Sequence, residues 1–212
     1  MNNIDVKTFL FGDTYLERLN NSYKSLCPEY ESWGIKGLPV FDVTSREMLE
    51  KYCQENDLVI WFCSTWFNGI AEYGRLKERL ENSELEEKDK LFIFFHNPEK
   101  RYGFASLTEN KTTRQEREFM KDHYLHVIEY LLQKHPNLYL CPLTLFFYET
   151  ILSSFFPDEN GFEEKFSEIF KDRIVPSGPF DLTHLEDYKG NFNENGYKKL
   201  LENIKEFTKL FE

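Results

Sequence analysis

One hydroxyl near the N-terminus lies where an enzyme could use it as a nucleophile. Residues 6–11 form a short, mainly apolar run, and Gly12 and Asp13 separate this run from Thr14. Such a run predicts a buried strand that ends in a tight turn into a helix. At this edge of an open α/β sheet, free N–H groups of a helix N-terminus can stabilise a developing anion. Thr14 is therefore a candidate nucleophile, and the alternative is that Asp13 or Thr14 only caps the next helix.

Three histidines could also take part in chemistry. His96 follows the apolar run 91–95 and could face the same edge of the sheet, although a histidine there is more often a hydrogen-bonded edge residue. His123 and His126 are three residues apart, a spacing that places both on one face of a helix. No carboxylate or cysteine at a matching spacing accompanies them, so we predict no metal site.

The elements that would position these side chains are predicted strands and helices, which alternate along the sequence. Residues 58–63 form an unbroken apolar run, which is typical of a central parallel strand covered on both faces. Further strands are predicted at residues 6–12, 91–95 and 138–143, and residues 32–40 predict a loop or a short strand. Apolar residues at helical spacing predict helices over residues 15–26, 44–52, 70–80, 113–134, 145–156, 162–170 and 195–211. This alternation predicts an α/β fold, a three-layer α/β/α sandwich with a mostly parallel sheet.

Length and charge restrict the classes of protein that the chain can belong to. The 212 residues, 41% of them apolar, are enough for one domain with a sizeable core. The net charge of −11 disfavours binding to nucleic acid or to anionic membrane surfaces. Residues 1–5 show no signal-peptide pattern, and no segment approaches the ~20 apolar residues that span a bilayer. We therefore expect a cytoplasmic protein without membrane insertion.

The four cysteines show no pattern of a metal site or of a disulfide framework. No Cys-x-x-Cys pair occurs, and two of the four lie in apolar, strand-like runs. We expect buried free thiols at Cys27, Cys53, Cys63 and Cys141.

Four short motifs follow one another in an order that is known from one family. They are Gly12-Asp13-Thr14, Ile35-Lys36-Gly37, Cys63-Ser64-Thr65 and Asp181-Leu182-Thr183-His184. This order resembles the SGNH (GDSL-like) hydrolases, a family of esterases, lipases and acyl-transferring enzymes. The resemblance covers most of the chain and implies a single SGNH-hydrolase-like domain over residues 1–212, with strands in flavodoxin-like order.

The resemblance also implies roles for particular residues. Thr14 takes the position of the family's nucleophilic serine, His184 that of the base, and Asp181 that of the carboxylate that orients the base. The N–H of the nucleophile, the N–H of Gly37 and an asparagine amide would form the oxyanion hole. Asp13, in the first motif, is a further candidate for binding the substrate.

The sequence departs from the family pattern at the oxyanion asparagine, and it leaves two alternatives open for the position of the catalytic histidine. Trp66 stands where the oxyanion asparagine belongs, and Asn68 follows two residues later. The run from Asn191 to Tyr197 fits the pattern His-x-Asn-x-x-Gly-Tyr, which would place Asn191 in the column of the histidine. In the other register His184 is the base, because Asp181 stands three residues before it.

The function that the resemblance implies is an esterase or O-acyltransferase acting on a small ester or an O-acyl group, including one on a carbohydrate. Its partner would be that small-molecule or carbohydrate ester, and no cofactor is expected. The alternative is a catalytically degraded SGNH-fold protein that binds a ligand or partner without turnover. A nucleotide-binding α/β protein is the weakest hypothesis, because neither Gly-x-Gly-x-x-Gly nor Gly-x-x-x-x-Gly-Lys-Ser/Thr occurs.

Overall fold

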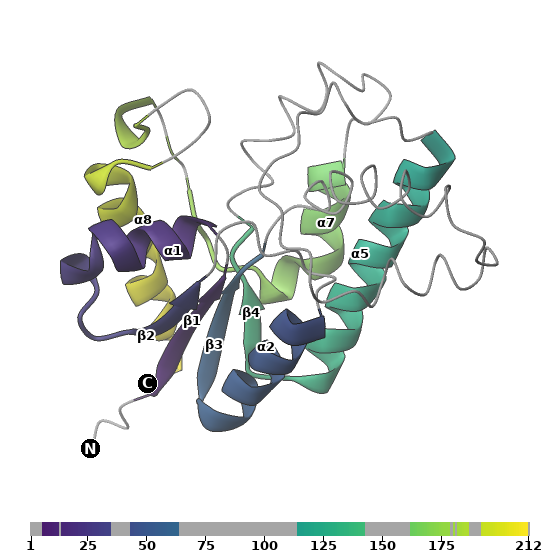
Figure 1. Ribbon diagram of the computed structural model, residues 1–212, viewed down its shortest axis with the longest axis horizontal. Coiled ribbons are helices and arrows are strands. Elements are labelled where there is room, and N and C mark those ends of the chain that lie inside the picture. Colours follow the sequence, from purple (N-terminus) through teal and green to yellow (C-terminus); the bar gives the residue numbers. More distant parts are fainter. Residues whose placement is uncertain are drawn as a thin grey trace, which may run out of the picture.

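The computed structural model shows a parallel sheet between two layers of helices (Figure 1). It describes residues 6–12, 14–34, 43–63, 114–142, 162–178, 180, 182–186 and 192–211. The predicted elements at 70–80, 91–95 and 145–156 lie outside these residues.

The sheet has four strands in the described part of the chain. They are β1 (Thr8–Gly12), β2 (Glu31–Gly34), β3 (Leu58–Phe62) and β4 (Leu138–Leu140). Their order is β2-β1-β3-β4 and each neighbouring pair is parallel, as in flavodoxin-like sheets. Ile174 adds a parallel bridge to Leu140 next to β4. The predicted parallel α/β architecture is therefore confirmed.

The two central strands are buried on both faces, which explains their unbroken apolar sequences. Every residue of β1 and β3 is buried. Because successive side chains of a strand point to opposite faces, each strand contributes side chains to two cores, one on each face of the sheet. Phe9 and Trp61 belong to one core, whereas Leu10 and Ile60 belong to the other.

The helices divide between these two cores (Figure 1). On one face α1 (Thr14–Ser22) packs beside α8 (Glu194–Thr208). On the other face lie α2 (Val43–Glu55), α5 (Arg114–Lys134) and α7 (Phe162–Phe170). This division confirms the predicted three layers.

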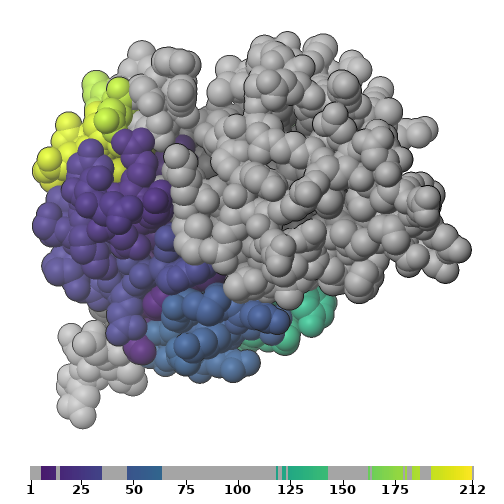
Figure 2. Space-filling model, viewed as in Figure 1, coloured from purple at the N-terminus to yellow at the C-terminus, as the bar shows by residue number. Residues whose placement is uncertain are grey.

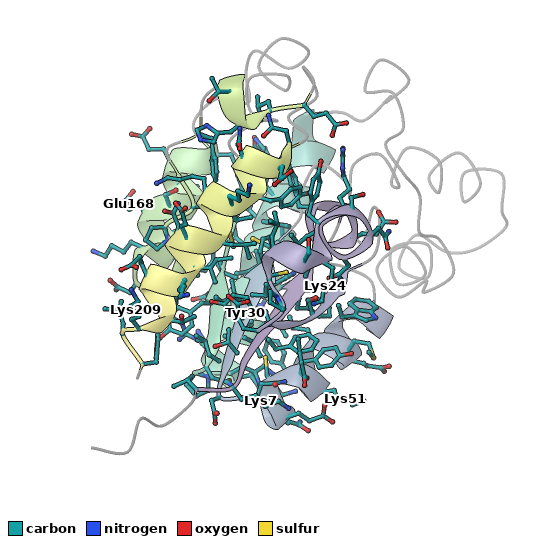
Figure 3. All side chains as sticks on the ribbon, turned by 90° about the vertical axis from the view of Figure 1, so that its left-hand side faces the viewer. Lys7, Lys24, Tyr30, Lys51, Glu168 and Lys209 are labelled. Atoms are coloured by element: carbon teal, nitrogen blue, oxygen red, sulfur yellow. The ribbon has the colours of Figure 1, made fainter. Side chains whose placement is uncertain are left out.

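The connection from α1 to β2 is fixed by a short 3-10 helix and one lysine. A 3-10 helix, Lys24–Leu26, follows α1, so the helix predicted over residues 15–26 ends four residues early. Lys24 Nζ donates hydrogen bonds to the carbonyl of Tyr30 at 2.9 Å and to Ser32 Oγ at 3.1 Å (Figure 3). These bonds hold the start of β2 against the end of α1.

Arg173 ties the end of α5 to β4. Its guanidinium donates to the carbonyl of His135 at 2.8 Å and to that of Leu138 at 2.7 and 3.0 Å. It also lies over the ring of Tyr139, 5.0 Å from the centroid. A planar, permanently charged group with five donors suits a site that offers several carbonyl acceptors.

Replacing Arg173 with methionine should lower the free energy of unfolding by about 2–4 kcal/mol, because the carbonyls of Leu132, His135 and Leu138 lose a charged donor. Denaturation in urea measures the change. Lys171→Met in the same 3-10 helix is the control, since Lys171 is exposed. Equal losses in both variants would show that the guanidinium bonds do not stabilise the fold.

His135 predicts a pH dependence of stability. Its side chain is buried, and Nε2 has no hydrogen-bond partner in the described part of the chain. Burial lowers the pKa of His135, so the unfolded chain takes up a proton more readily than the folded one. The free energy of unfolding should therefore fall as the pH drops below about 6.5. Urea denaturation of wild type and His135→Leu at pH 7.5 and 5.5, roughly one unit either side of the ordinary pKa of histidine, tests this prediction. The same pH dependence of the unfolding free energy in both proteins would contradict it.

Candidate active site

The first part of the candidate site is the junction of β1 with α1. β1 ends at Gly12 and α1 begins at Thr14, so Thr14 lies at the carboxyl end of a central strand. An added Cβ at Gly12 would lie 2.6 Å from Phe62 Cβ, closer than real side chains approach. The glycine in the first motif is therefore required by the close approach of β1 to β3.

The backbone at this junction can bind an anion. The first N–H groups of a helix have no partner within the helix, and the helix dipole makes that end electropositive. Thr14 is the first residue of α1 and Tyr15 is the second. The side chain of Thr14 and the whole of Asp13 lie outside the described residues, so their roles as nucleophile or cap stay predictions.

The second part of the candidate site is the segment before α8. Leu182–His184 form a 3-10 helix, and Leu185 then pairs antiparallel with Phe192. The His184 side chain is half-buried, and its ring meets that of Phe180 edge to face with centroids 5.8 Å apart. His184 thus lies next to the Leu185–Phe192 pair, which precedes α8.

Three contacts bring this segment and the first turn of α8 against the first turns of α1. The Tyr197 hydroxyl donates to the carbonyl of Tyr15 at 2.9 Å, and the rings of Tyr15 and Phe192 meet at 5.3 Å. Arg18, one turn after Thr14, forms an ion pair with Glu186, two residues after His184.

These contacts place the amino-terminal and carboxyl-terminal motifs on one side of the sheet. On the surface, the yellow atoms of the C-terminal part of the chain lie directly against the purple atoms of the N-terminal part (Figure 2). A row of aromatic rings continues the contact, because Phe180 packs on Phe192 at 4.6 Å and on His184 at 5.8 Å. The structure therefore brings the elements that carry Thr14 and His184 together.

The other candidate residues lie outside the part of the chain that the structure describes. Their predicted roles in orienting the base, binding the oxyanion and binding substrate stay predictions. They are Asp181, Gly37, Asn68 and Asn191, together with Trp66 and His96.

The remaining predictions about chemistry concern thiols and metals. All four cysteines are free and buried, as predicted. Burial raises the pKa of Cys53 to about 12, so this thiol is unreactive near neutral pH. His126 is exposed on α5, and the described residues contain no group of three side chains that could hold a metal ion. Within the same residues, no helix has the length and apolar character to span a membrane.

A separate cavity of about 470 Å³ lies at the opposite end of β1. It is lined by Lys7 and Tyr30, which immediately precede β1 and β2 (Figure 3), by the first residues of those strands, and by Lys205 and Thr208 at the end of α8. The amino ends of the strands form this cavity, so it is distinct from the edge that carries Thr14.

Sequence reasoning missed the residues that join the two halves of the site. Arg18 and Glu186 are 168 residues apart, and no local pattern indicates that they pair. For Asn193 and Tyr197 a signal existed, because the pattern Asn-x-x-Gly-Tyr marked the start of the last helix. The contacts of that segment with His184 and Tyr15 were not predicted.

Comparison with known proteins supports the fold alone. No family model matches the chain, and no curated protein matches it. A solved structure from Bacteroides thetaiotaomicron, described as a GDSL-like lipase, is 12% identical with a TM-score of 0.54, covering 97% of this chain and 89% of its own. A structure from Bacteroides fragilis assigned as an acylhydrolase is 13% identical with a TM-score of 0.52, covering 97% and 87%. The chain therefore has an SGNH-hydrolase-like fold.

Proposed function

We propose that the protein is an esterase or O-acyltransferase that acts on a small ester or O-acyl group, including one on a carbohydrate. Thr14 is the nucleophile, His184 is the general base and Asp181 orients the imidazole. The oxyanion is bound by the N–H groups of Thr14 and Gly37, with the side-chain amide of Asn68 as a further donor.

One observation carries this proposal. The segment of His184 and the first turn of α8 pack on the first turns of α1, through the Arg18 ion pair with Glu186 and the Tyr197 hydrogen bond to Tyr15. The segments that carry Thr14 and His184 come from opposite ends of the chain and lie on the same face of the sheet. This supports a reaction that uses a hydroxyl and an imidazole. The likeness of the fold to structures described as an acylhydrolase and a lipase supports the same chemistry.

In the first half-reaction the acyl group moves to the protein. His184 accepts the proton of the Thr14 hydroxyl while Oγ attacks the carbonyl carbon of the ester. The carbonyl oxygen becomes an oxyanion, and the N–H donors at the start of α1 stabilise it. The tetrahedral intermediate collapses, the bond to the alcohol breaks, and His184 returns the proton to the leaving oxygen.

In the second half-reaction the acyl group leaves Thr14. Water or an acceptor alcohol attacks the acyl carbon while His184 accepts its proton. The bond to Thr14 Oγ breaks, and the proton passes from His184 to that oxygen. Water gives hydrolysis and a sugar hydroxyl gives transfer, so the esterase and the transferase share every protein group.

The test is turnover of p-nitrophenyl acetate with detection of the acyl-protein. Intact-protein mass spectrometry after a rapid acid quench should show a gain of one acetyl group, and peptide mapping should place it at Thr14. Adding a carbohydrate alcohol should divert the acetyl group from water if the protein is a transferase. Steady turnover without acetylation of Thr14, at concentrations that saturate the protein, would contradict a Thr14 acyl intermediate.

Thr14 itself favours a second function, binding without turnover. The extra methyl group of threonine restricts χ1 and crowds the attack on a carbonyl. A protein of this kind would bind a carbohydrate ester and leave it intact. Calorimetric titration with an acetylated sugar, followed by recovery of the unchanged ester, would establish this alternative.

A further inference from the structure

Asn193 contacts the backbone on both sides of His184. Its side-chain Nδ2 donates to the carbonyl of Thr183 at 2.8 Å and to that of Leu185 at 3.0 Å. Its backbone N–H donates to the carbonyl of His184 at 3.1 Å. A single residue therefore binds three consecutive carbonyl groups, and the middle one belongs to the proposed base.

The same residue also begins α8. Asn193 is the N-cap, and its Oδ1 accepts a hydrogen bond from the N–H of Gly196 at 3.1 Å. An added Cβ at Gly196 would lie 2.4 Å from the carbonyl oxygen of His184. The close seating of the His184 turn on α8 thus requires both the amide of Asn193 and a glycine at position 196.

The next residue of this turn connects α8 to the other half of the site. Tyr197 is fully buried, and its hydroxyl donates to the carbonyl of Tyr15, the residue after Thr14. The first turn of α8 therefore contacts the backbone of the proposed base on one side and, on the other, the backbone of Tyr15, the residue after the proposed nucleophile.

We infer that Asn193 is a positioning residue for His184, holding the backbone of that turn at a fixed place relative to Thr14 through the start of α8. The inference rests on the proposed function. Asparagine suits the role because its side chain accepts at one end and donates two hydrogen bonds at the other. Small displacements matter here, since a shift of about 1 Å in a reacting group can cost about 100-fold in rate.

Asn193→Asp separates positioning from capping. Aspartate caps a helix about as well as asparagine, and its charge is favourable at a helix N-terminus. A carboxylate cannot donate to the carbonyls of Thr183 and Leu185, and it repels them. The substitution should therefore keep α8 and release the His184 turn.

The chain offers a matched control at the opposite end of the sheet. Asn137 Nδ2 also bridges two carbonyls, those of Cys53 and Asn56, each at 2.8 Å. Asn137 immediately precedes β4, at the amino end of that strand. Asn137→Asp removes the same pair of donors far from the site, so it reports the effect of lost stability alone.

The expected result is a loss of rate in one variant only. With p-nitrophenyl acetate, kcat of Asn193→Asp should fall about 10- to 100-fold with KM within about twofold of wild type. Asn137→Asp should keep wild-type kcat with a similar loss in unfolding free energy. If Asn193 acts through His184, adding Asn193→Asp to His184→Ala should cause no further loss.

Two kinetic results would overturn the inference and leave the proposed function standing. One is loss of turnover in His184→Ala with full kcat in Asn193→Asp, and the other is an equal effect of Asn193→Asp with and without His184. Turnover that survives His184→Ala would instead overturn the proposed function. The ¹H–¹⁵N resonances of the His184 imidazole test the positioning without any substrate, because Asn193→Asp should shift them and Asn137→Asp should not. Unshifted resonances in Asn193→Asp would also overturn the inference.

Discussion

Thr14→Val should abolish ester turnover, with a loss in kcat/KM of at least about 10⁴-fold. Valine replaces the hydroxyl by a methyl group and keeps the β-branched shape, so the start of α1 should be preserved. Thr14→Ser should retain or raise activity, because serine keeps the nucleophilic oxygen and removes the methyl group that crowds it. Initial rates with p-nitrophenyl acetate measure both effects.

The same pair of variants separates the nucleophile from a capping residue. If the hydroxyl only caps α1, valine should lower the free energy of unfolding by about 1 kcal/mol and leave the rate unchanged. Denaturation of both variants in urea therefore accompanies the kinetic measurement. Turnover by folded Thr14→Val at the wild-type rate would exclude Thr14 as the nucleophile.

His184→Ala should lower kcat/KM by about 10²- to 10⁴-fold, the usual contribution of a general base. The Thr14 hydroxyl then loses the proposed acceptor of its proton. Because the substitution leaves a space of the size of the ring, added imidazole should restore part of the rate. His184→Gln should stay inactive under the same conditions, since an amide fills the space but does not accept the proton.

Asn191→Ala is the matched control for the register of the C-terminal motif. If Asn191 occupied the column of the histidine and no base existed, His184→Ala and Asn191→Ala should have equally small effects. A large loss in His184→Ala with little change in Asn191→Ala would establish His184 as the base. A large loss in Asn191→Ala with little change in His184→Ala would show that turnover depends on Asn191 and not on His184.

Much of the architecture followed from local patterns. The apolar run over residues 58–63 predicted a strand buried on both faces, and β3 is central and buried throughout. The long helix predicted over residues 113–134 is α5, Arg114–Lys134, and the C-terminal stripe is α8. These elements were predictable because periodicity records which faces are buried.

In two segments the secondary structure depends on contacts with elements that are distant in the sequence. Residues 32–40 predicted a loop or a short strand, and Glu31–Gly34 form β2 because β1 supplies parallel partners for them. Apolar spacing continued from Tyr15 to Leu26, yet α1 ends at Ser22. A tight turn then leads the chain into β2, so Leu26, the last apolar residue of that stripe, belongs to a 3-10 helix.

By itself the sequence determined the layers, the central strands and the residue types that could transfer an acyl group, because these depend on periodicity and on the chemistry of single side chains. Only the tertiary structure decided that Tyr197 bonds to Tyr15 across 182 residues and that Asn193 binds the carbonyls around His184. Such contacts depend on how α1 and α8 pack on the same face of the sheet. Spacing along the chain carries no record of that packing, since it results from the burial of both helices at once.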